Sequence, residues 1–408
     1  MMSGIVIIGG GLAGGRAART VRELGYAGDV TILAAEPHFP YERPPLSKEV
    51  LQGKHEPDSV YLKPDDWYAE QRIDVRTGVR VSAIHTDTHE VSTESGERLA
   101  YDKLVIATGS RARVLDIEGA DLAGVHTLRT VDESTELHDL LKSGDRRVVV
   151  IGSGWIGMEV AASARSLGNE VTVVARGSVP LSAALGNTLG TEFQRLHESH
   201  GVKFVMNAAV DRIAGDGRVK GVVVNGETIP ADLVVVGVGA EPNTELATAA
   251  GIEVDDGILT DDSFRTSAAD VFAIGDVANV QHPVAGRRLR SEHWSNALNQ
   301  GKAVARALTG ETVSYDEIPY FYTDQFELGM ELSGYPHLMK DAKIVVRGDL
   351  AANEYIAFWV REGSVVAGMN VNIWDVNEAV QQLIRSKHTI DESRLADTNS
   401  TLEELAAE

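Results

Sequence analysis

Two glycine-rich motifs in this sequence have the spacing that binds the diphosphate of a dinucleotide. The first, Gly9–Gly14, follows the apolar run 5–8 and opens a helical pattern. The second, Gly152–Gly157, follows the equally apolar run 148–151. In such a strand–turn–helix unit the first glycine permits a tight turn, the second admits the diphosphate, and the third lets helix pack on strand. One such motif also occurs in ordinary loops, but two in one chain predict two bound dinucleotides.

The unpaired N–H groups and the positive dipole end of each following helix would hold the diphosphate. The residues that we expect to contact a cofactor in the two motifs are Gly9, Gly11, Leu12, Ala13 and Gly14, and then Gly152, Gly154, Ile156 and Gly157.

Polar residues at the ends of other predicted strands extend the first site. Glu36 follows the strand 29–33 and stands 22 residues after Gly14, near the spacing of an acid that binds a ribose 2′-OH. A plain surface glutamate explains Glu36 equally well. Two buried runs end in Thr108-Gly109 and Gly275-Asp276, and ligands of parallel sheets bind at such ends. Asp276 could instead be only a helix N-cap.

Composition excludes several classes of function. The chain has no cysteine, which rules out disulfides, thiolate zinc sites, a dithiol relay and an Fe–S cluster bound by this chain. The net charge of −22 disfavours nucleic acid as a partner. Neither a membrane-spanning run nor room for a signal peptide is found, so we expect no membrane partner and a cytoplasmic location. We also expect no metal.

A length of 408 residues suggests two or three domains. The repeated strand–motif–helix pattern predicts a first nucleotide-binding domain made of residues 1–112 and 237–316, interrupted by a second at residues 113–236. Alternating strands and a helix predict a separate α+β domain at residues 317–408, whose acidic end, 391–408, we expect to pack loosely. Residues 75–81 and 89–93 are predicted as a small antiparallel pair.

The order of the motifs adds a resemblance to a known family. Besides the two glycine motifs and the strand ends described above, the chain contains Arg43-Pro44-Pro45-Leu46-Ser47-Lys48, Glu159, Glu292-His293-Trp294 and the run 319–325. Throughout its length the sequence resembles the FAD-dependent ferredoxin reductases of bacterial oxygenase systems. The resemblance implies an α/β fold of the glutathione-reductase type, with two Rossmann-like nucleotide-binding domains and a C-terminal α+β domain. It also implies bound FAD, with NAD(P)H as co-substrate.

The resemblance implies roles for individual residues. Glu36 would lie at the adenosine ribose, Arg43 and Lys48 against the flavin with Lys48 near N5, Asp276 at the ribitol chain and Trp294 beside the isoalloxazine. Glu159 would face the nicotinamide and could pair with Lys48, and these two are the catalytic candidates. If the resemblance is set aside, Arg43 and Lys48 are interpreted as solvated charges. Glu159 is then an ordinary helix-face acid, and Trp294 is a core aromatic. His293 is assigned no chemistry.

The sequence departs from this family at the second ribose site. The strand 171–174 ends at Ala175-Arg176, where NADH-using members resembling this one carry glutamate. Without that acid the 2′-OH loses its partner, whereas an arginine can meet a 2′-phosphate. This change favours NADPH over NADH, unless Arg176 simply points to solvent.

The resemblance implies that electrons pass from NAD(P)H through FAD, one at a time, to a [2Fe–2S] ferredoxin serving an oxygenase. A rubredoxin reductase and an NADH-binding flavoprotein like apoptosis-inducing factor are the alternatives. An acidic chain needs a basic region to dock an acidic ferredoxin, and the candidates are Arg287, Arg288 and Arg290, with Arg385 and Lys387 as a second group. These charges could equally be solvated surface. We expect a monomer or weak homodimer.

Overall fold

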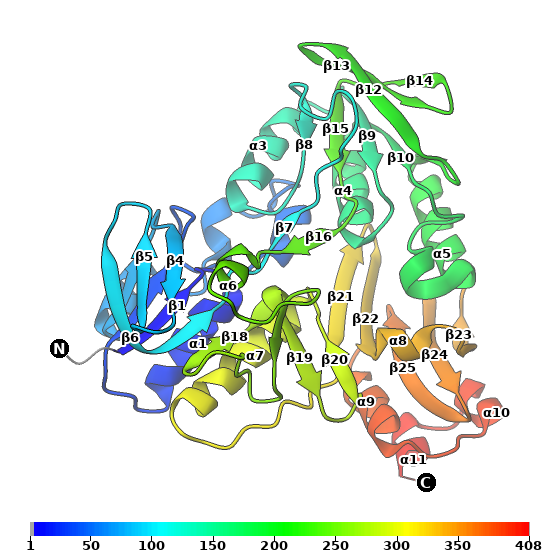
Figure 1. The fold of residues 1–408 in the computed structure, drawn as a ribbon. Helices are drawn as coiled ribbons and strands as arrows, with labels where there is room; N and C mark the ends of the chain where they lie inside the picture. Colours follow the sequence, from blue (N-terminus) through cyan, green and yellow to red (C-terminus); the bar gives the residue numbers. More distant parts are fainter. Residues whose placement is uncertain (1–3, 408) are drawn as a thin grey trace. The chain divides into compact units, whose positions relative to one another are not determined.

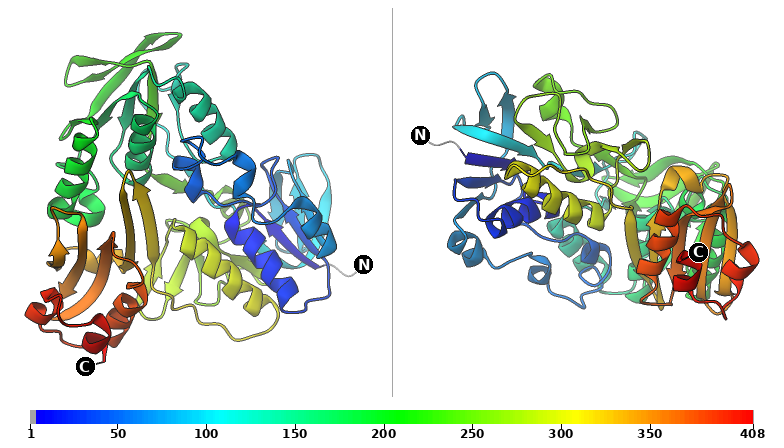
Figure 2. Two further views of the ribbon diagram at one scale, coloured as in Figure 1. Left: turned by 180° about the vertical axis from the view of Figure 1, so that it is seen from behind. Right: turned by 90° about the horizontal axis from the view of Figure 1, so that it is seen from below.

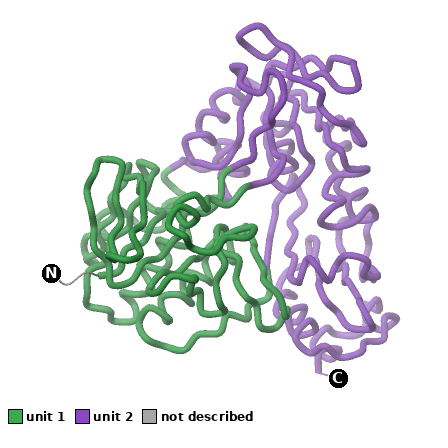
Figure 3. Tube along the Cα trace, in the orientation of Figure 1, with its two compact units in different colours: residues 1–43, 58–111, 241–319 green, residues 44–57, 112–240, 320–408 purple. Residues whose placement is uncertain are grey.

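The computed structural model describes residues 4–407 of the chain. Their contacts divide the chain into two compact units (Figure 3), each built from three chain segments. Unit 1 comprises residues 1–43, 58–111 and 241–319, and unit 2 comprises residues 44–57, 112–240 and 320–408. The Arg-Pro-Pro-Leu-Ser-Lys stretch is therefore cut after Arg43, and its remainder belongs to unit 2. The three-domain division made from the sequence remains a prediction.

Unit 1 is built on a parallel sheet whose central strand is the apolar run before the first glycine motif (Figure 1). Its parallel strands, in spatial order, are β3 (Ile73–Arg76), β2 (Val30–Leu33), β1 (Gly4–Ile8), β6 (Arg98–Ile106) and β18 (Val271–Ala273). The strand β1 is buried along its whole length, as a central parallel strand covered on both faces must be. Helices α1 (Leu12–Glu23) and α7 (Trp294–Leu308) pack side by side in unit 1 (Figure 2).

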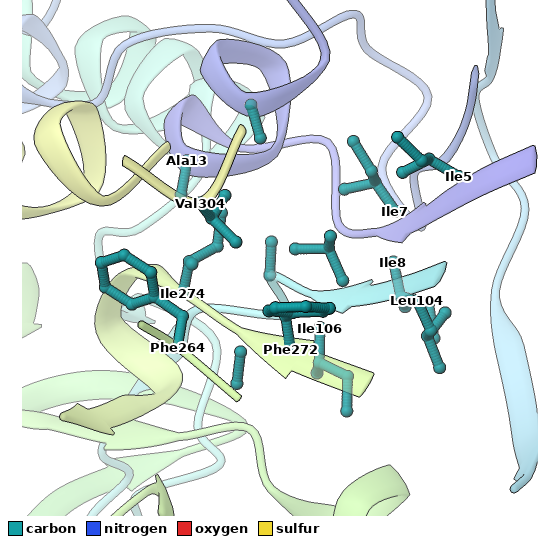
Figure 4. Close-up of a cluster of buried hydrophobic side chains, with 14 of the residues drawn as sticks. Ile5, Ile7, Ile8, Ala13, Leu104, Ile106, Phe264, Phe272, Ile274 and Val304 are labelled. Carbon is teal, nitrogen blue, oxygen red and sulfur yellow. The ribbon is translucent and has the colours of Figure 1, made fainter. Parts of the chain in front are cut away.

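Apolar residues of these strands and helices form the core of unit 1 (Figure 4). Ile7 and Ile106 contribute from neighbouring strands, Phe272 from β18, and Val304 from α7. The predicted pair at 75–81 and 89–93 was wrong in part. The chain turns at Gly78, which has a φ of +68°, so residues 73–76 join the parallel sheet as β3. The antiparallel pair is instead β4 (Val81–His85) with β5 (Glu90–Thr93).

Unit 2 contains a second parallel sheet around the run that precedes the second glycine motif. Its order is β11 (Lys203–Val205), β10 (Glu170–Val174), β9 (Arg147–Ile151), β15 (Leu233–Val236) and β8 (Val125–His126). Helices α3 (Val131–Leu141), α4 (Trp155–Ser166) and α5 (Ser182–Ser199) belong to this part, as does an antiparallel sheet of β12 (Val210–Asp216), β13 (Arg218–Val224) and β14 (Glu227–Pro230). Thr130 and Glu133 start α3 with a reciprocal capping box.

The C-terminal part of unit 2 is a five-stranded antiparallel sheet with helices on it (Figure 2). The strand order is β21 (Tyr320–Gln325), β22 (Leu328–Gly334), β25 (Ser364–Val371), β24 (Glu354–Arg361) and β23 (Lys343–Asp349). Its helices are α8 (Pro336–Met339), α9 (Asn377–Ser386), α10 (Glu392–Ala396) and α11 (Leu402–Ala406). One buried cluster joins this sheet to α4 and α5, with Met330 and Tyr355 on one side and Met158 and Phe193 on the other.

The expectation of loose packing after residue 391 was wrong. Leu395, Leu402 and Leu405 are all buried, and α11 packs against α9. Arg347 also donates hydrogen bonds to backbone oxygens of this segment, including that of Asp397 at 2.5 Å. The acidic residues lie between leucines at helical spacing, so the segment buries one face although its composition is polar.

The remaining elements are short. They are the 3₁₀ turns η1 (Pro44–Ser47), η2 (Pro57–Val60) and η3 (Gly275–Val277), the helices α2 (Asp65–Glu70) and α6 (Glu245–Ala249), and the strands β7 (Ser110–Ala112), β16 (Ala240–Pro242), β17 (Ile258–Thr260), β19 (Ala278–His282) and β20 (Arg287–Leu289). Among residues 4–407, no helix combines the length and apolar character needed to cross a membrane.

Candidate functional site

The first glycine motif leaves an open cradle at the start of α1. Gly9 has a φ of +122°, and a Cβ there would lie 2.1 Å from the carbonyl oxygen of Ala107. A Cβ on Gly14 would lie 2.2 Å from the Gly9 oxygen, so contacts within the chain require both glycines. Gly11 differs, because no described atom apart from those of its own chain neighbours lies within 4 Å of its would-be Cβ. A glycine that the protein's own packing does not require fits a site where a ligand approaches the backbone.

The second motif repeats this geometry at the start of α4. Gly152 has a φ of +110° and would place a Cβ 2.2 Å from the Gly237 oxygen, and Gly157 would approach the Gly152 oxygen equally closely. Gly154 is open, like Gly11, and Ile156 is exposed at the helix start. Neither α1 nor α4 has a side-chain cap at its N-terminus. Both ends therefore present unpaired N–H groups, which suits the diphosphate of a dinucleotide.

Glu36 is held in an ion pair within unit 1. Its Oε1 accepts a hydrogen bond from Arg43 Nη2 at 2.8 Å, and Tyr41 donates its hydroxyl to Oε2. Burial disfavours the charged carboxylate, but the Arg43 charge and the two hydrogen bonds outweigh it, so the pKa of Glu36 is lowered. Glu36 is thus not a freely solvated glutamate, and Arg43 is not a solvated charge. The structure brings together one residue expected at the ribose and one expected at the flavin.

Asp276 is buried in η3 and accepts a hydrogen bond from Ser110 Oγ at 2.8 Å. The N-cap interpretation of Asp276 is wrong, because α7 begins after His293 and η3 begins after Ile274. At the end of β6, Thr108 Oγ1 donates to the backbone oxygen of Asn243 at 2.8 Å. Gly109 has a φ of +64° and Gly275 one of +76°, which explains glycine at both strand ends.

Trp294 opens α7 and packs partly buried against the core of unit 1, near the Glu42 carboxylate. Its expected place beside the flavin remains a prediction. His293 is the N-cap residue of α7, and burial lowers the pKa of its imidazole.

Lys48 and Glu159 form an ion pair inside unit 2. Lys48 Nζ lies 3.6 Å from Glu159 Oε1, and the side chains are only 6% and 4% exposed. The two prolines start the turn η1, which delivers Lys48 to this position. Ser134 Oγ anchors the turn by donating to the Leu46 oxygen at 2.6 Å, and Ser163 Oγ donates to the Ser47 oxygen at 2.7 Å. The interpretations of Lys48 as a solvated charge and of Glu159 as an ordinary helix-face acid were wrong.

Two hydroxyl groups complete the surroundings of the Glu159 carboxylate. Ser47 Oγ donates to Oε2, and Thr323 Oγ1 donates to Oε1 at 2.6 Å. The Lys48 ammonium also lies 5.2 Å from the centre of the Tyr322 ring. Both charges are therefore balanced by close partners, as buried ions must be. Sequence reasoning missed Ser47 and Thr323, which lie in quoted motifs but were given no role there.

The second ribose position has no acid. Ala175 is buried at the end of β10 and bonds to Val205 and Ala208 through its backbone. Arg176 is exposed and makes no hydrogen bond or ion pair with any described residue. An arginine in this state is available to an anion.

The candidate docking arginines are not a uniform basic surface. Arg287 is exposed, but Arg288 Nη1 donates to the backbone oxygens of Thr260 and Asn279 at 2.6 and 3.1 Å. Arg290 is mostly buried and pairs with two acids, Asp256 at 3.1 Å and Glu292 at 2.7 Å. Of this group only Arg287 offers an uncommitted positive charge. Arg385 and Lys387 are both exposed at the end of α9.

Comparisons with known proteins agree with this geometry. Residues 3–301 match the pyridine nucleotide-disulphide oxidoreductase family, and residues 320–406 match the C-terminal reductase domain family. Rhodocoxin reductase of Rhodococcus erythropolis is 37% identical over 98% of this chain and 93% of its own length. The ferredoxin–NAD(+) reductase component of the biphenyl dioxygenase system of Paraburkholderia xenovorans is also 37% identical, over 99% of this chain and 98% of its own.

Among solved structures, the covalent complex of putidaredoxin reductase with putidaredoxin superposes with a TM-score of 0.94. The match has 33% sequence identity and covers 99% of this chain and 98% of that one. These matches show that the chain belongs to the pyridine nucleotide-disulphide oxidoreductase family. Because it lacks the cysteines that disulphide chemistry would need, it is, within that family, an oxidoreductase of the ferredoxin reductase group.

Proposed function

We propose that this protein oxidises NAD(P)H and passes the electrons through bound FAD to a [2Fe–2S] ferredoxin that serves an oxygenase. The observation that carries the proposal is the pair of open cradles at Gly11 and Gly154, one at each helix start, in a chain without cysteine. The ferredoxin is supported by the relatives, one of which is named as part of a dioxygenase system and another of which was solved in complex with putidaredoxin.

The residues proposed to hold FAD are Gly9, Gly11, Leu12, Ala13, Gly14, Glu36, Arg43, Lys48, Thr108, Gly109, Gly275, Asp276 and Trp294. The NAD(P)H residues would be Gly152, Gly154, Ile156, Gly157, Glu159, Ala175 and Arg176. A bound flavin accepts an electron pair and releases single electrons, which no side chain of this cysteine-free protein can do.

The protein's own contribution to this chemistry is electrostatic. Lys48 is a fixed, buried cation that would stabilise negative charge as it develops next to it, and the low local dielectric strengthens that effect. Glu159, fixed by Ser47 and Thr323, keeps the ammonium in place. Because these groups are already ordered, little reorganisation is needed during the reaction.

A panel assay tests the proposal. Purified protein would be supplied with NADH or NADPH and with [2Fe–2S] ferredoxins, a rubredoxin, or ferricyanide as acceptor. Fast reduction of a ferredoxin supports the proposal. Reduction of rubredoxin alone would identify a rubredoxin reductase, and NADH binding without turnover of any one-electron carrier would indicate a protein resembling apoptosis-inducing factor.

Substituting the two open glycines should remove the two cofactors separately. We expect Gly11→Val to yield folded protein without flavin absorption, because the new side chain meets no protein atom but fills the space for the diphosphate. Gly154→Val should retain FAD and raise the KM for the pyridine nucleotide by about tenfold or more, because one or two backbone hydrogen bonds to the diphosphate would be lost. Absorption spectra and steady-state kinetics measure both. Each variant is the control for the other, since both glycines are unobstructed and have extended backbone angles, with φ of −84° and −77°, that valine can adopt.

The coenzyme preference tests the role of Arg176. We propose that this exposed arginine favours NADPH, since an arginine–phosphate contact is charge-assisted and often bidentate. Arg176→Ala should lower the NADPH/NADH ratio of kcat/KM by about tenfold, and Ala175→Glu should lower it further by repelling the 2′-phosphate. An unchanged ratio in both variants would mean that Arg176 remains in solvent, in keeping with the NAD(+) in the name of the biphenyl system relative.

Ferredoxin docking is proposed to involve Arg287, the exposed and uncommitted arginine of its group. Arg287→Glu should lower kcat/KM for the ferredoxin several-fold at low salt, with the difference fading as salt screens the charges. Ferricyanide reduction should be unchanged, because that small oxidant needs no docking surface. Arg212→Glu makes the same charge change on β12, at an exposed arginine, and serves as control. Equal losses of kcat/KM for the ferredoxin in the two variants would show that the change in net charge alone causes the effect.

A further inference from the structure

A chain of buried hydrogen bonds leads from the catalytic candidates to a histidine that the proposed chemistry does not use. Thr323 Oγ1 lies 2.6 Å from Glu159 Oε1, Gln325 Nε2 lies 3.2 Å from Thr323 Oγ1, and His197 Nε2 lies 2.8 Å from Gln325 Oε1. Thr323 and Gln325 are two residues apart on β21 and so share one face of the strand. His197 comes from the last turn of α5. All these residues are in unit 2.

Every donor in this chain points toward the carboxylate. Thr323 gives its hydroxyl proton to the Glu159 carboxylate, so its oxygen must accept from the next residue, and only the amide nitrogen of Gln325 can donate to it. The amide oxygen of Gln325 then faces His197, whose Nε2 must carry the proton. Donors ordered in one direction polarise one another, which strengthens the final bond to Glu159.

The burial of these groups argues against simple space filling. His197 and Thr323 are completely buried and Gln325 is 1% exposed. His197 Nδ1 has no hydrogen-bond partner among the described residues, and the rings of Phe204 and Phe326 pack against the imidazole. A leucine or phenylalanine would fill this apolar site without burying an unpaired nitrogen, which is a costly group to remove from water. The imidazole is thus explained by its Nε2–H bond to Gln325.

We infer that Gln325 and His197 are positioning residues for the reaction. Gln325 fixes the direction of the Thr323 hydroxyl, and His197 fixes the direction of the Gln325 amide, so that Glu159 holds Lys48 in one place. Without these hydrogen bonds the Gln325 amide could rotate and the Thr323 hydroxyl could turn away. Glu159 would then have Ser47 as its one hydroxyl donor among the described residues. The inference rests on the proposed function only in that Lys48 and Glu159 act during flavin reduction.

Kinetics of the whole flavoprotein give the first test. Gln325→Leu should slow flavin reduction by NADPH at saturating coenzyme by about tenfold, the effect of one lost hydrogen bond, with KM changed less than about twofold. Thr323→Val should behave alike, and Thr323→Ser, which keeps the hydroxyl, should restore the rate. In the Lys48→Met background, Gln325→Leu should have no added effect. Ser333→Ala is the control, since Ser333 is a buried hydroxyl of the same sheet that bonds to Asn377 and Gln381.

A second readout does not depend on activity. Proton–nitrogen NMR spectra of histidine-labelled holoprotein should show His197 protonated at Nε2, and Glu159→Gln should shift its ring resonances whereas Ser333→Ala should not. A His197 protonated at Nδ1, or one unaffected by Glu159→Gln, would overturn the inference, as would an unchanged rate in folded Gln325→Leu. Protein that reduces ferricyanide but no ferredoxin would refute the proposed partner and leave these results intact.

Discussion

Lys48→Met is expected to slow flavin reduction by pyridine nucleotide about a hundredfold, with a much smaller change in coenzyme affinity. A preorganised charge that faces developing negative charge stabilises the transition state more than the ground state, and removing one such group costs about 10²–10³ in rate. Methionine keeps most of the buried volume of lysine, so the packing around η1 should survive. Stopped-flow measurement of the flavin absorbance, over a range of NADPH and NADH concentrations, separates the limiting rate from binding.

The same experiment tests whether Lys48 and Glu159 act as one unit. Glu159→Gln alone leaves a buried ammonium without its anion and should also slow the reaction, but added to Lys48→Met it should change the rate little. Independent, multiplicative losses in the double variant would contradict the coupling. Lys54→Met provides the control, because Lys54 lies in the same chain segment, is exposed, and should tolerate the change at the wild-type rate.

Much of the fold could be predicted because its strands are continuous apolar runs next to glycine motifs. The runs 5–8 and 148–151 are central parallel strands, and the buried runs before Thr108-Gly109 and Gly275-Asp276 are strands of the first of these sheets. The errors came from segments whose composition and burial disagree. Residues 75–81 look like one strand, yet Gly78 turns the chain within it. Leu402 and Leu405 are buried although acids surround them, because contact with α9 decides their environment.

The candidate site could be predicted only where its chemistry is local in sequence. The glycine motifs carry their own geometry, so Gly11 and Gly154 could be singled out from spacing alone. The environment of Glu159 could not, since Ser47 is 112 residues away and Thr323 is 164 residues away. The docking arginines show the same limit. Arg288 and Arg290 look like surface charges until the backbone oxygens and acids that hold them are known.

Acid should destabilise this protein through His197 well before its carboxylates are protonated. Burial lowers the pKa of His197 to about 4, which the hydrogen bond to Gln325 opposes only in part and nearby His200 reinforces. Since the pKa is about 6.5 in the unfolded chain, the unfolded state takes up the proton first as the pH falls. His197 therefore leaves the free energy of unfolding unchanged above about pH 6.5. Between about pH 6.5 and 4 it lowers that free energy progressively, by roughly 3 kcal/mol in all.

Urea unfolding of the holoprotein at pH 7.5, 6.0 and 5.0 measures this effect, with fluorescence and circular dichroism as probes. His126 and His293, whose pKa values are also lowered by burial, add to the acid destabilisation. His197→Phe should lower stability at pH 7.5 yet flatten its pH dependence, because the phenyl ring has no proton to gain. His388→Phe, at an exposed histidine, should keep the wild-type slope. If the stability of His197→Phe fell with decreasing pH as steeply as that of the wild type, the pKa of His197 would be the same in the folded and the unfolded protein.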